Sequence, residues 1–165
     1  MKNLTNDTKI ALLMGGPGSE REVSLVSGKA VLEALQEEGF THVPPVVVDG
    51  ERPPIPEGTE LCFNIIHGTY GEDGGLQAYL EELGIPYTGS DALSSAMAMD
   101  KAVSKKIMEH CGVRTPAWQE LTVREAGPGC VGTVPEFRRQ GIGIVEFLHQ
   151  RNDSIRITSC LLDRI

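Results

Sequence analysis

The chain has 165 residues, of which 40% are hydrophobic, and a formal net charge of −8, so its length suits one domain of ordinary size or one domain plus a fragment. The acidic balance and the lack of any basic run argue against nucleic acid or a membrane surface as a partner, and no apolar run approaches the roughly 20 residues that span a bilayer. Because residues 1–9 lack the apolar core of a signal peptide, the sequence predicts a cytoplasmic protein that acts on a small molecule.

Residues 9–35 predict a buried strand, a glycine-rich turn and an amphipathic helix, in that order. Residues 9–14 are a short apolar run followed by glycines, which is typical of an inner strand of a parallel sheet. Ser19, followed three residues later by Glu22, has the pattern of a capping box for the helix. The apolar positions that we expect on the buried face of this helix are Val23, Val26, Ala30, Val31, Ala34 and Leu35.

The turn between this strand and this helix is a candidate binding site, because open α/β sheets bind ligands at the carboxyl ends of their strands. It matches neither of two common phosphate-binding loops. Val23 stands where the phosphate-cradle pattern needs a glycine, and Arg21 stands where the dinucleotide pattern needs one. A plain strand-to-helix turn, in which Glu20 and Glu22 favour the helix dipole, also explains the loop.

The sequence up to about residue 121 continues to alternate strands and helices. We predict strands at 46–49, 61–66 and 85–88, helices at 76–83, 92–99 and 101–111, and an extended segment at 115–121. Asp91 and Asp100 are placed to cap the last two of these helices. This alternation predicts the α/β fold class, with a parallel sheet flanked by helices on both faces.

His67 follows the buried strand 61–66 and begins a second glycine-rich loop that also contains Glu72 and Asp73. A histidine at a strand end beside carboxylates can orient a substrate or exchange a proton near neutral pH, although a histidine in such a place can also be structural. The repeated strand, loop and helix predicts that Glu20 and His67 lie at the same carboxyl edge of the sheet.

The four cysteines stand far apart and form no C-x-x-C pair, which indicates neither a zinc site nor a redox motif. We therefore expect no metal bound by cysteine, and reduced thiols at Cys62, Cys111, Cys130 and Cys160.

Three stretches together resemble the N-terminal third of the D-alanine–D-alanine ligases: MGGPGSEREVSLVSGKAV, FNIIHGTYGEDGGLQAYLEELGIPYTGSDALSSAMAMDKAVSK and GVRTPAW. The resemblance runs from about residue 9 to residue 121. It implies a Rossmann-like domain that precedes the ATP-grasp domains, and an enzyme of peptidoglycan precursor synthesis that uses ATP and Mg²⁺. In this family ATP phosphorylates the carboxylate of the first D-alanine, and the amine of the second D-alanine attacks the acyl phosphate.

The resemblance also implies roles for four residues and a homodimer. Glu20 matches the glutamate that holds the ammonium group of the first D-alanine, and Ser24 matches a serine that supports that site. His67 matches the histidine beside the first D-alanine, so that the expected catalytic residues are His67 and Ser24. Lys101 matches a lysine that reaches the nucleotide phosphates, although a solvated lysine at a helix start is an equal alternative. The resemblance leaves D-lactate or D-serine open as the second substrate.

Residues 122–165 form a tail in which we recognise none of the family's nucleotide, arginine or magnesium motifs. The tail contains six Arg and no Lys against five acidic residues, whereas residues 1–121 contain six Lys and three Arg against eighteen. Residues 138–143, RRQGIG, resemble the R-x-x-G-x-G motif of GNAT acetyltransferases, which holds the pyrophosphate of acetyl-CoA. In that interpretation Ile144, Val145 and Leu148 form the inner face of a helix, and residues 154–160 form the next strand.

Three hypotheses follow. The chain is the substrate-binding N-terminal portion of a D-alanine–D-alanine ligase, truncated before its ATP-binding parts and inactive alone, with a domain at 1–121 and a non-matching or frame-shifted tail at 122–165. Alternatively, it is a non-catalytic α/β module that binds D-alanine or a partner subunit. The third hypothesis is a fusion with an acetyl-CoA-binding fragment.

Overall fold

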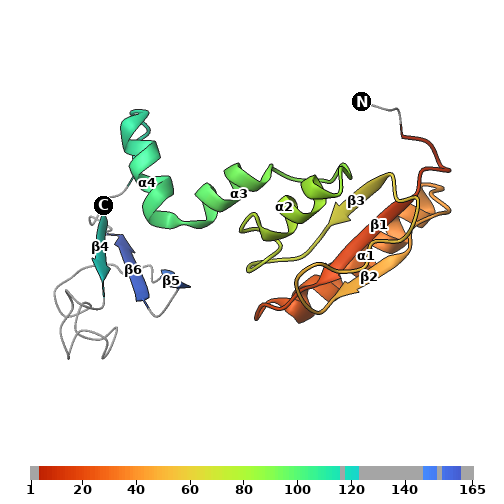
Figure 1. Ribbon diagram of the computed structural model, residues 1–165, viewed down its shortest axis with the longest axis horizontal. Coiled ribbons are helices and arrows are strands. Elements are labelled where there is room, and N and C mark those ends of the chain that lie inside the picture. The colour runs from red at the N-terminus through yellow and green to blue at the C-terminus, as the bar shows by residue number, and fades with distance from the viewer. Residues whose placement is uncertain (1–3, 116–117, 123–146, 152–153, 161–165) are drawn as a thin grey trace. The chain divides into compact units, whose positions relative to one another are not determined.

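The structure is a computed structural model that describes residues 4–115, 118–122, 147–151 and 154–160. The chain divides into a first unit, Met1–Met99, and a second unit, Asp100–Ile165. The first unit contains β1 (Ile10–Gly15), α1 (Arg21–Glu37), β2 (Pro45–Val48), β3 (Leu61–Asn64), α2 (Gly75–Glu82) and α3 (Ala92–Met99) (Figure 1). The second unit contains α4 (Lys101–His110), β4 (Trp118–Thr122), β5 (Phe147–Arg151) and β6 (Ser154–Cys160).

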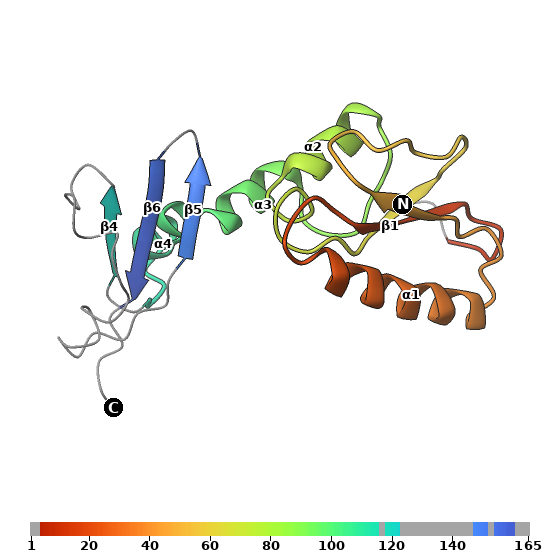
Figure 2. The ribbon, with the colours of Figure 1, turned by 90° about the horizontal axis from the view of Figure 1, so that it is seen from below.

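The first unit is built on a parallel sheet of strand order β2-β1-β3, which confirms the predicted α/β fold. All six residues of the central strand β1 are buried. Ile10, Leu12 and Met14 point to one side of the sheet, where α1 packs, whereas Ala11 and Leu13 point to the other side, where α2 packs. Figure 2 shows α1 and α2 on opposite faces of the sheet. A strand covered on both faces needs apolar residues at every position, which explains the unbroken apolar run.

The predicted strands and helices are found within a few residues of their expected bounds, with two exceptions in the sheet. The strand predicted at 61–66 ends at Asn64, because the Asn64 side chain accepts a hydrogen bond from the Ile66 N–H at 3.0 Å and turns the chain. The strand predicted at 85–88 is reduced to one parallel bridge between Cys62 and Tyr87.

The predicted capping box of α1 is wrong. The residue at the N-cap is Glu20 rather than Ser19, and no side chain caps this helix. A capping box needs its serine at the N-cap itself, so that Ser19 is one position too early. The caps predicted for the later helices are confirmed: the Asp91 carboxylate accepts from the Ser94 N–H at 2.7 Å, and Asp100 accepts from the N–H groups of Ala102 and Val103.

The buried face of α1 also differs from the prediction. Val23 and Val26 are 58% and 69% exposed, whereas Ser24 and Gly28 are fully enclosed. Gly28 lies so close to β1 that a Cβ on it would stand 2.8 Å from the Cβ of Met14. Close contact between helix and strand therefore selects small residues, and the larger side chains that flank it are Leu25, Val31, Leu32 and Leu35.

The second unit contains an antiparallel sheet of order β4-β6-β5. The extended segment predicted at 115–121 corresponds to β4, and the strand predicted at 154–160 is β6. The helix predicted to include Leu148 is wrong there, because Leu148 pairs with Ile157 as part of β5. Antiparallel pairing with β6 across a short connection overrides the helical spacing of the apolar residues. Ile144, Val145 and residues 138–143 lie outside the described residues.

Candidate functional site

The carboxyl edge of the parallel sheet brings together the two glycine-rich loops that follow β1 and β3. Gly68 has a φ of +69°, and a Cβ on it would stand 2.7 Å from Glu20 Oε2. A Cβ on Gly18 would stand 3.6 Å from the backbone N of Thr69, an ordinary van der Waals distance, so the two loops are also in contact there. The prediction that Glu20 and the loop of His67 lie at the same edge is therefore confirmed, and the positive φ of Gly68 favours glycine where the loop meets the carboxylate.

Ser24 fixes this edge from inside the protein. Its side chain is fully buried. The hydroxyl accepts a hydrogen bond from the Gly15 N–H at 2.9 Å and donates one to the Ile65 carbonyl at 2.7 Å. Ser24 thus ties α1 to the carboxyl ends of both β1 and β3, and its hydroxyl proton is used in the backbone contact. The geometry gives Ser24 a positioning task, because it sets where Glu20, one helical turn earlier, enters the edge.

Arg21 is a second positioning residue, and the sequence analysis missed it. Its guanidinium donates to the carbonyls of Gly16 and Val48 at 3.2 and 2.8 Å, and it pairs with the Asp49 carboxylate at 2.6 Å. These contacts join the ends of β1 and β2 to the start of α1. Arg21 lies directly after Glu20. The sequence feature that could have indicated its role is its place at a helix start, where the helix dipole disfavours a cation. An arginine found there is expected to have a specific partner.

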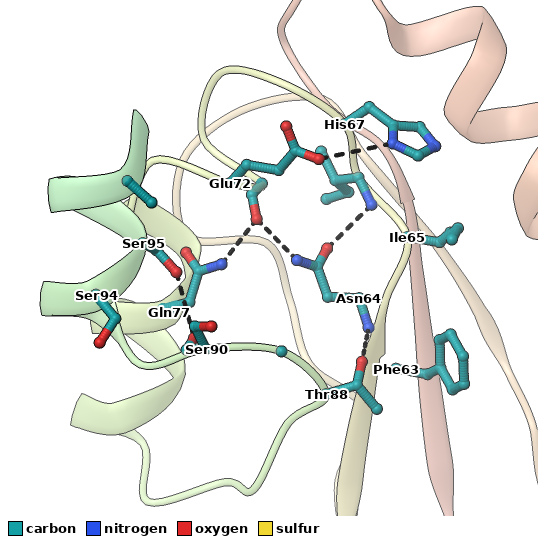
Figure 3. A pocket seen from close by; sticks show the side chains of 14 residues that line it. Phe63, Asn64, Ile65, His67, Glu72, Gln77, Thr88, Ser90, Ser94 and Ser95 are labelled. Carbon is teal, nitrogen blue, oxygen red and sulfur yellow. Dashed lines mark hydrogen bonds and ion pairs between the residues drawn. The ribbon is translucent and has the colours of Figure 1, made fainter. Parts of the chain in front are cut away.

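His67 lies beside Glu72, as the sequence suggested. The distance between His67 Nδ1 and Glu72 Oε1 is 3.8 Å, and the His67 side chain is one-third exposed. The other oxygen of Glu72 accepts from the Gly68 N–H at 2.9 Å, while the Glu72 N–H donates to the Gly68 carbonyl at 2.9 Å. The partly exposed imidazole therefore stands at the edge, next to a carboxylate whose position is fixed by the backbone (Figure 3).

Two amide side chains bind the backbone of the loop 67–75, and no sequence motif had indicated either of them. Asn64 Nδ2 and Gln77 Nε2 both donate to the carbonyl of Gly71, each at 2.8 Å. Asp73 then closes the loop, because its carboxylate accepts from the N–H groups of Tyr70 and Gly75, each at 3.0 Å. These contacts hold residues 67–75 in one shape without a ligand.

Lys101 is the first residue of α4 in the second unit and is described apart from Glu20 and His67. The Asp100 carboxylate takes two N–H groups of the first turn of α4, at 3.0 Å from Ala102 N and 3.1 Å from Val103 N. These donors are the ones that a phosphate would use at a helix start. An anion at this helix start would therefore compete with the Asp100 carboxylate for these donors.

The described residues contain no group of three or more His, Cys, Asp or Glu side chains that could hold a metal ion. None of the helices in the described part of the chain is long and apolar enough to cross a membrane.

Comparison with known proteins identifies relatives for most of the chain. Residues 48–90 match a family model described as D-ala D-ala ligase N-terminus. The D-alanine–D-alanine ligase of Desulforudis audaxviator is 50% identical over 119 residues, which cover 72% of this chain and 39% of that protein. The ligase of Citrifermentans bemidjiense is 45% identical over 145 residues, covering 83% of this chain and 47% of the relative. The chain thus spans less than half the length of these relatives, and the second alignment extends past residue 121.

Solved structures give the same result. A D-alanine–D-alanine ligase from Bacillus anthracis complexed with ATP has a TM-score of 0.66 and 39% identity, covering 72% of this chain and 42% of that one. A second structure of that ligase has a TM-score of 0.70 and 32% identity, covering 95% of this chain and 49% of the other. None of the relatives named here is an acetyltransferase, and the comparisons give no support to the acetyl-CoA motif.

Proposed function

Because the N-terminal part of this chain belongs to the D-alanine–D-alanine ligase family as its N-terminal domain, we propose that it forms one wall of the site that binds the first D-alanine of such a ligase. The observation that supports this most is the position of the Glu20 carboxylate, which lies against Gly68 at the edge where His67 also stands. Carboxylates at this edge, Glu20 and Glu72, favour a cationic group, as the ammonium of an amino acid is.

In the proposed arrangement, Glu20 pairs with the ammonium group of D-alanine and His67 lies beside its carboxylate. An imidazole N–H can donate a hydrogen bond to a carboxylate oxygen, both before and after that carboxylate is phosphorylated. Ser24 does not need to touch the substrate for this, since its hydroxyl proton goes to the Ile65 carbonyl. Its proposed role is to hold Glu20 at a fixed position relative to the end of β3.

The family uses ATP and magnesium, and we propose no site for either on the described residues. No cluster of carboxylates in the described part suits a metal ion, and the first N–H groups of α4 are taken by Asp100. Phosphoryl transfer depends on groups that position and neutralise phosphate oxygens. We therefore derive no step through these groups, and propose for Lys101 only that it adds one positive charge near the phosphates.

A titration with D-alanine tests the proposal. We expect the backbone amide resonances of residues 18–21 and 67–69 to shift. Glu20→Gln should weaken binding about two- to fivefold, since an exposed ion pair contributes up to about 1 kcal/mol. Glu22→Gln removes an exposed carboxylate two residues further along and serves as the matched control. Shifts confined to other parts of the chain, or equal affinity of the Glu20 and Glu22 variants, would refute the assignment.

If the chain is instead a non-catalytic binding module, it should bind D-alanine equally well. The two hypotheses can be distinguished by adding the ATP-grasp portion of a relative as a separate chain. Dipeptide synthesis by the mixture is expected if this chain is part of a ligase, and no synthesis is expected if it is a binding module. The homodimer and the cytoplasmic location of the family are also proposals for this chain, and sedimentation analysis tests the first of them.

A further inference from the structure

A second pocket lies within the first unit, on the side of β3 away from β1. Its volume is about 550 Å³, which is in the range of small-molecule sites. The end of β3, the loop 67–72, α2, residues 88–90 and α3 surround it (Figure 3). Its wall includes Glu72 and His67, so that it adjoins the proposed amino-acid site, but Glu20 and Ser24 do not line it.

Gln77 gives the strongest indication of a ligand. The residue is 4% exposed, and its Nε2 donates to the Gly71 carbonyl at 2.8 Å. Its carbonyl oxygen, Oε1, is buried and has no hydrogen-bond partner in the described part of the chain. Leaving a buried acceptor unpaired is unfavourable. A ligand that brings an N–H group to this wall supplies the missing donor once the Gln77 amide turns its oxygen toward the pocket.

The wall of the pocket also carries neutral hydroxyls, from Thr88, Ser90, Ser94 and Ser95. Thr88 Oγ1 accepts from the Asn64 N–H at 3.0 Å, and within the described part of the chain the Thr88 hydroxyl donates to no side chain or carbonyl. Ser90 adds a hydroxyl on the same loop. Thr88 thus offers a donor in the wall of the same pocket that Gln77 lines. A group that both donates and accepts, as an amide does, is complementary to this pair.

The charge and the apolar surface of the pocket limit the chemical class of ligand that it can bind. No Lys or Arg stands among the residues that line the pocket, and the carboxylate at its rim is Glu72. An anionic ligand would therefore meet the Glu72 carboxylate, and among the lining residues only His67 can carry a positive charge. Phe63, Ile65 and Ala98 supply an apolar wall, which suits a ligand with an apolar body.

We propose that this pocket binds a small uncharged molecule that carries a primary or secondary amide next to an apolar group. The amide N–H pairs with Gln77 Oε1, the amide carbonyl accepts from the Thr88 hydroxyl, and the apolar group lies against Phe63 and Ile65. The pocket adjoins the proposed D-alanine site and shares His67 and Glu72 with it, but Glu20 and Ser24 do not line it.

Benzamide and benzoate form a matched pair of probes, since they have the same shape and differ in charge and in the N–H donor. Titrated into the full chain and followed by ¹H–¹⁵N correlation spectra, benzamide should shift the resonances of Thr88, Ser90 and the Gln77 side-chain amide. Benzoate should bind at least tenfold more weakly. Binding of both probes with equal affinity, or no shift of these resonances by benzamide at its solubility limit, would overturn the proposal.

Ala98→Leu places a larger side chain in the pocket from an exposed turn of α3 and should weaken benzamide binding at least fivefold. Ala78→Leu is the matched control, because Ala78 lies on α2 and does not line the pocket. An equal loss in both variants, or no loss in Ala98→Leu, counts against the site. If the spectrum of Ala98→Leu shows that the variant is unfolded, Ala98→Met at the same position decides between these outcomes.

Discussion

The contact between α1 and β1 predicts an unusual response to Gly28→Ala. Replacing a glycine inside a helix by alanine ordinarily stabilises a protein by roughly 0.5–1 kcal/mol, because the unfolded chain loses freedom and the helix gains propensity. At Gly28 the new Cβ would stand 2.8 Å from Met14 Cβ, 2.9 Å from its Cε and 3.0 Å from its Sδ. The thioether can rotate away, but Met14 Cβ is fixed by a buried central strand.

Relieving that contact requires α1 and β1 to separate by several tenths of an ångström, and overpacking of this kind costs about 1–3 kcal/mol. We therefore expect Gly28→Ala to lower the free energy of unfolding by about 1–2 kcal/mol, with the sign opposite to that of the propensity scale. Adding Met14→Ala removes Sδ and Cε but not Cβ, so the double variant should not recover the loss.

The assay is urea unfolding followed by near-ultraviolet circular dichroism of tyrosine, because all three tyrosines lie in the first unit. The matched control is Ser27→Ala, one residue earlier in α1, which should change stability by only a few tenths of a kcal/mol. A Gly28→Ala variant as stable as the parent, or more so, would refute the close contact that we infer.

Three further predictions concern the site and its support. Ser24→Ala should lower the free energy of unfolding by about 2–4 kcal/mol in the same assay, because it leaves the buried Gly15 N–H and Ile65 carbonyl without a partner; a loss below 0.5 kcal/mol would contradict this. Burial raises the pKa of the Cys62 thiol from 9.0 to about 11, so the stabilisation from its neutral form is complete below about pH 9 and is lost as the pH rises through 11. Cys62→Ala should therefore weaken the fall in stability between pH 9 and pH 11, and an unchanged pH profile would argue against it. The chain alone, given ATP, magnesium and D-alanine, should release no phosphate above a Glu20→Gln control, and dipeptide synthesis by the parent would require a nucleotide site that the described residues do not show.

The sequence predicted the elements that depend on apolar patterning and on glycine. The burial of β1 follows from its unbroken apolar run, and the meeting of Glu20 with the loop of His67 follows from two strands that end in glycine loops on one parallel sheet. Both predictions rest on rules that hold for any parallel sheet. This is why the candidate site could be located before its geometry was known.

The sequence did not predict which face of α1 is buried, because the deciding residues are small. Apolar periodicity favoured Val23 and Val26, whereas Ser24 and Gly28 allow the helix to approach β1. The supporting amides of Asn64 and Gln77 were also missed, since their partner is a backbone carbonyl several residues away. Contacts between a side chain and a distant backbone group leave no spacing pattern in the sequence.

The loop after β3 has a consequence for the rate of binding. Tyr70 has a φ of +71°, a left-handed conformation that disfavours a bulky residue. It is held there by the bond from its N–H to Asp73 and by the bond from the Arg52 N–H to its hydroxyl at 2.9 Å. Because the loop already holds this strained conformation, we expect it to change its conformation little when a ligand binds. Association with D-alanine should then be a single step, with an observed rate that rises linearly with ligand concentration and shows no plateau.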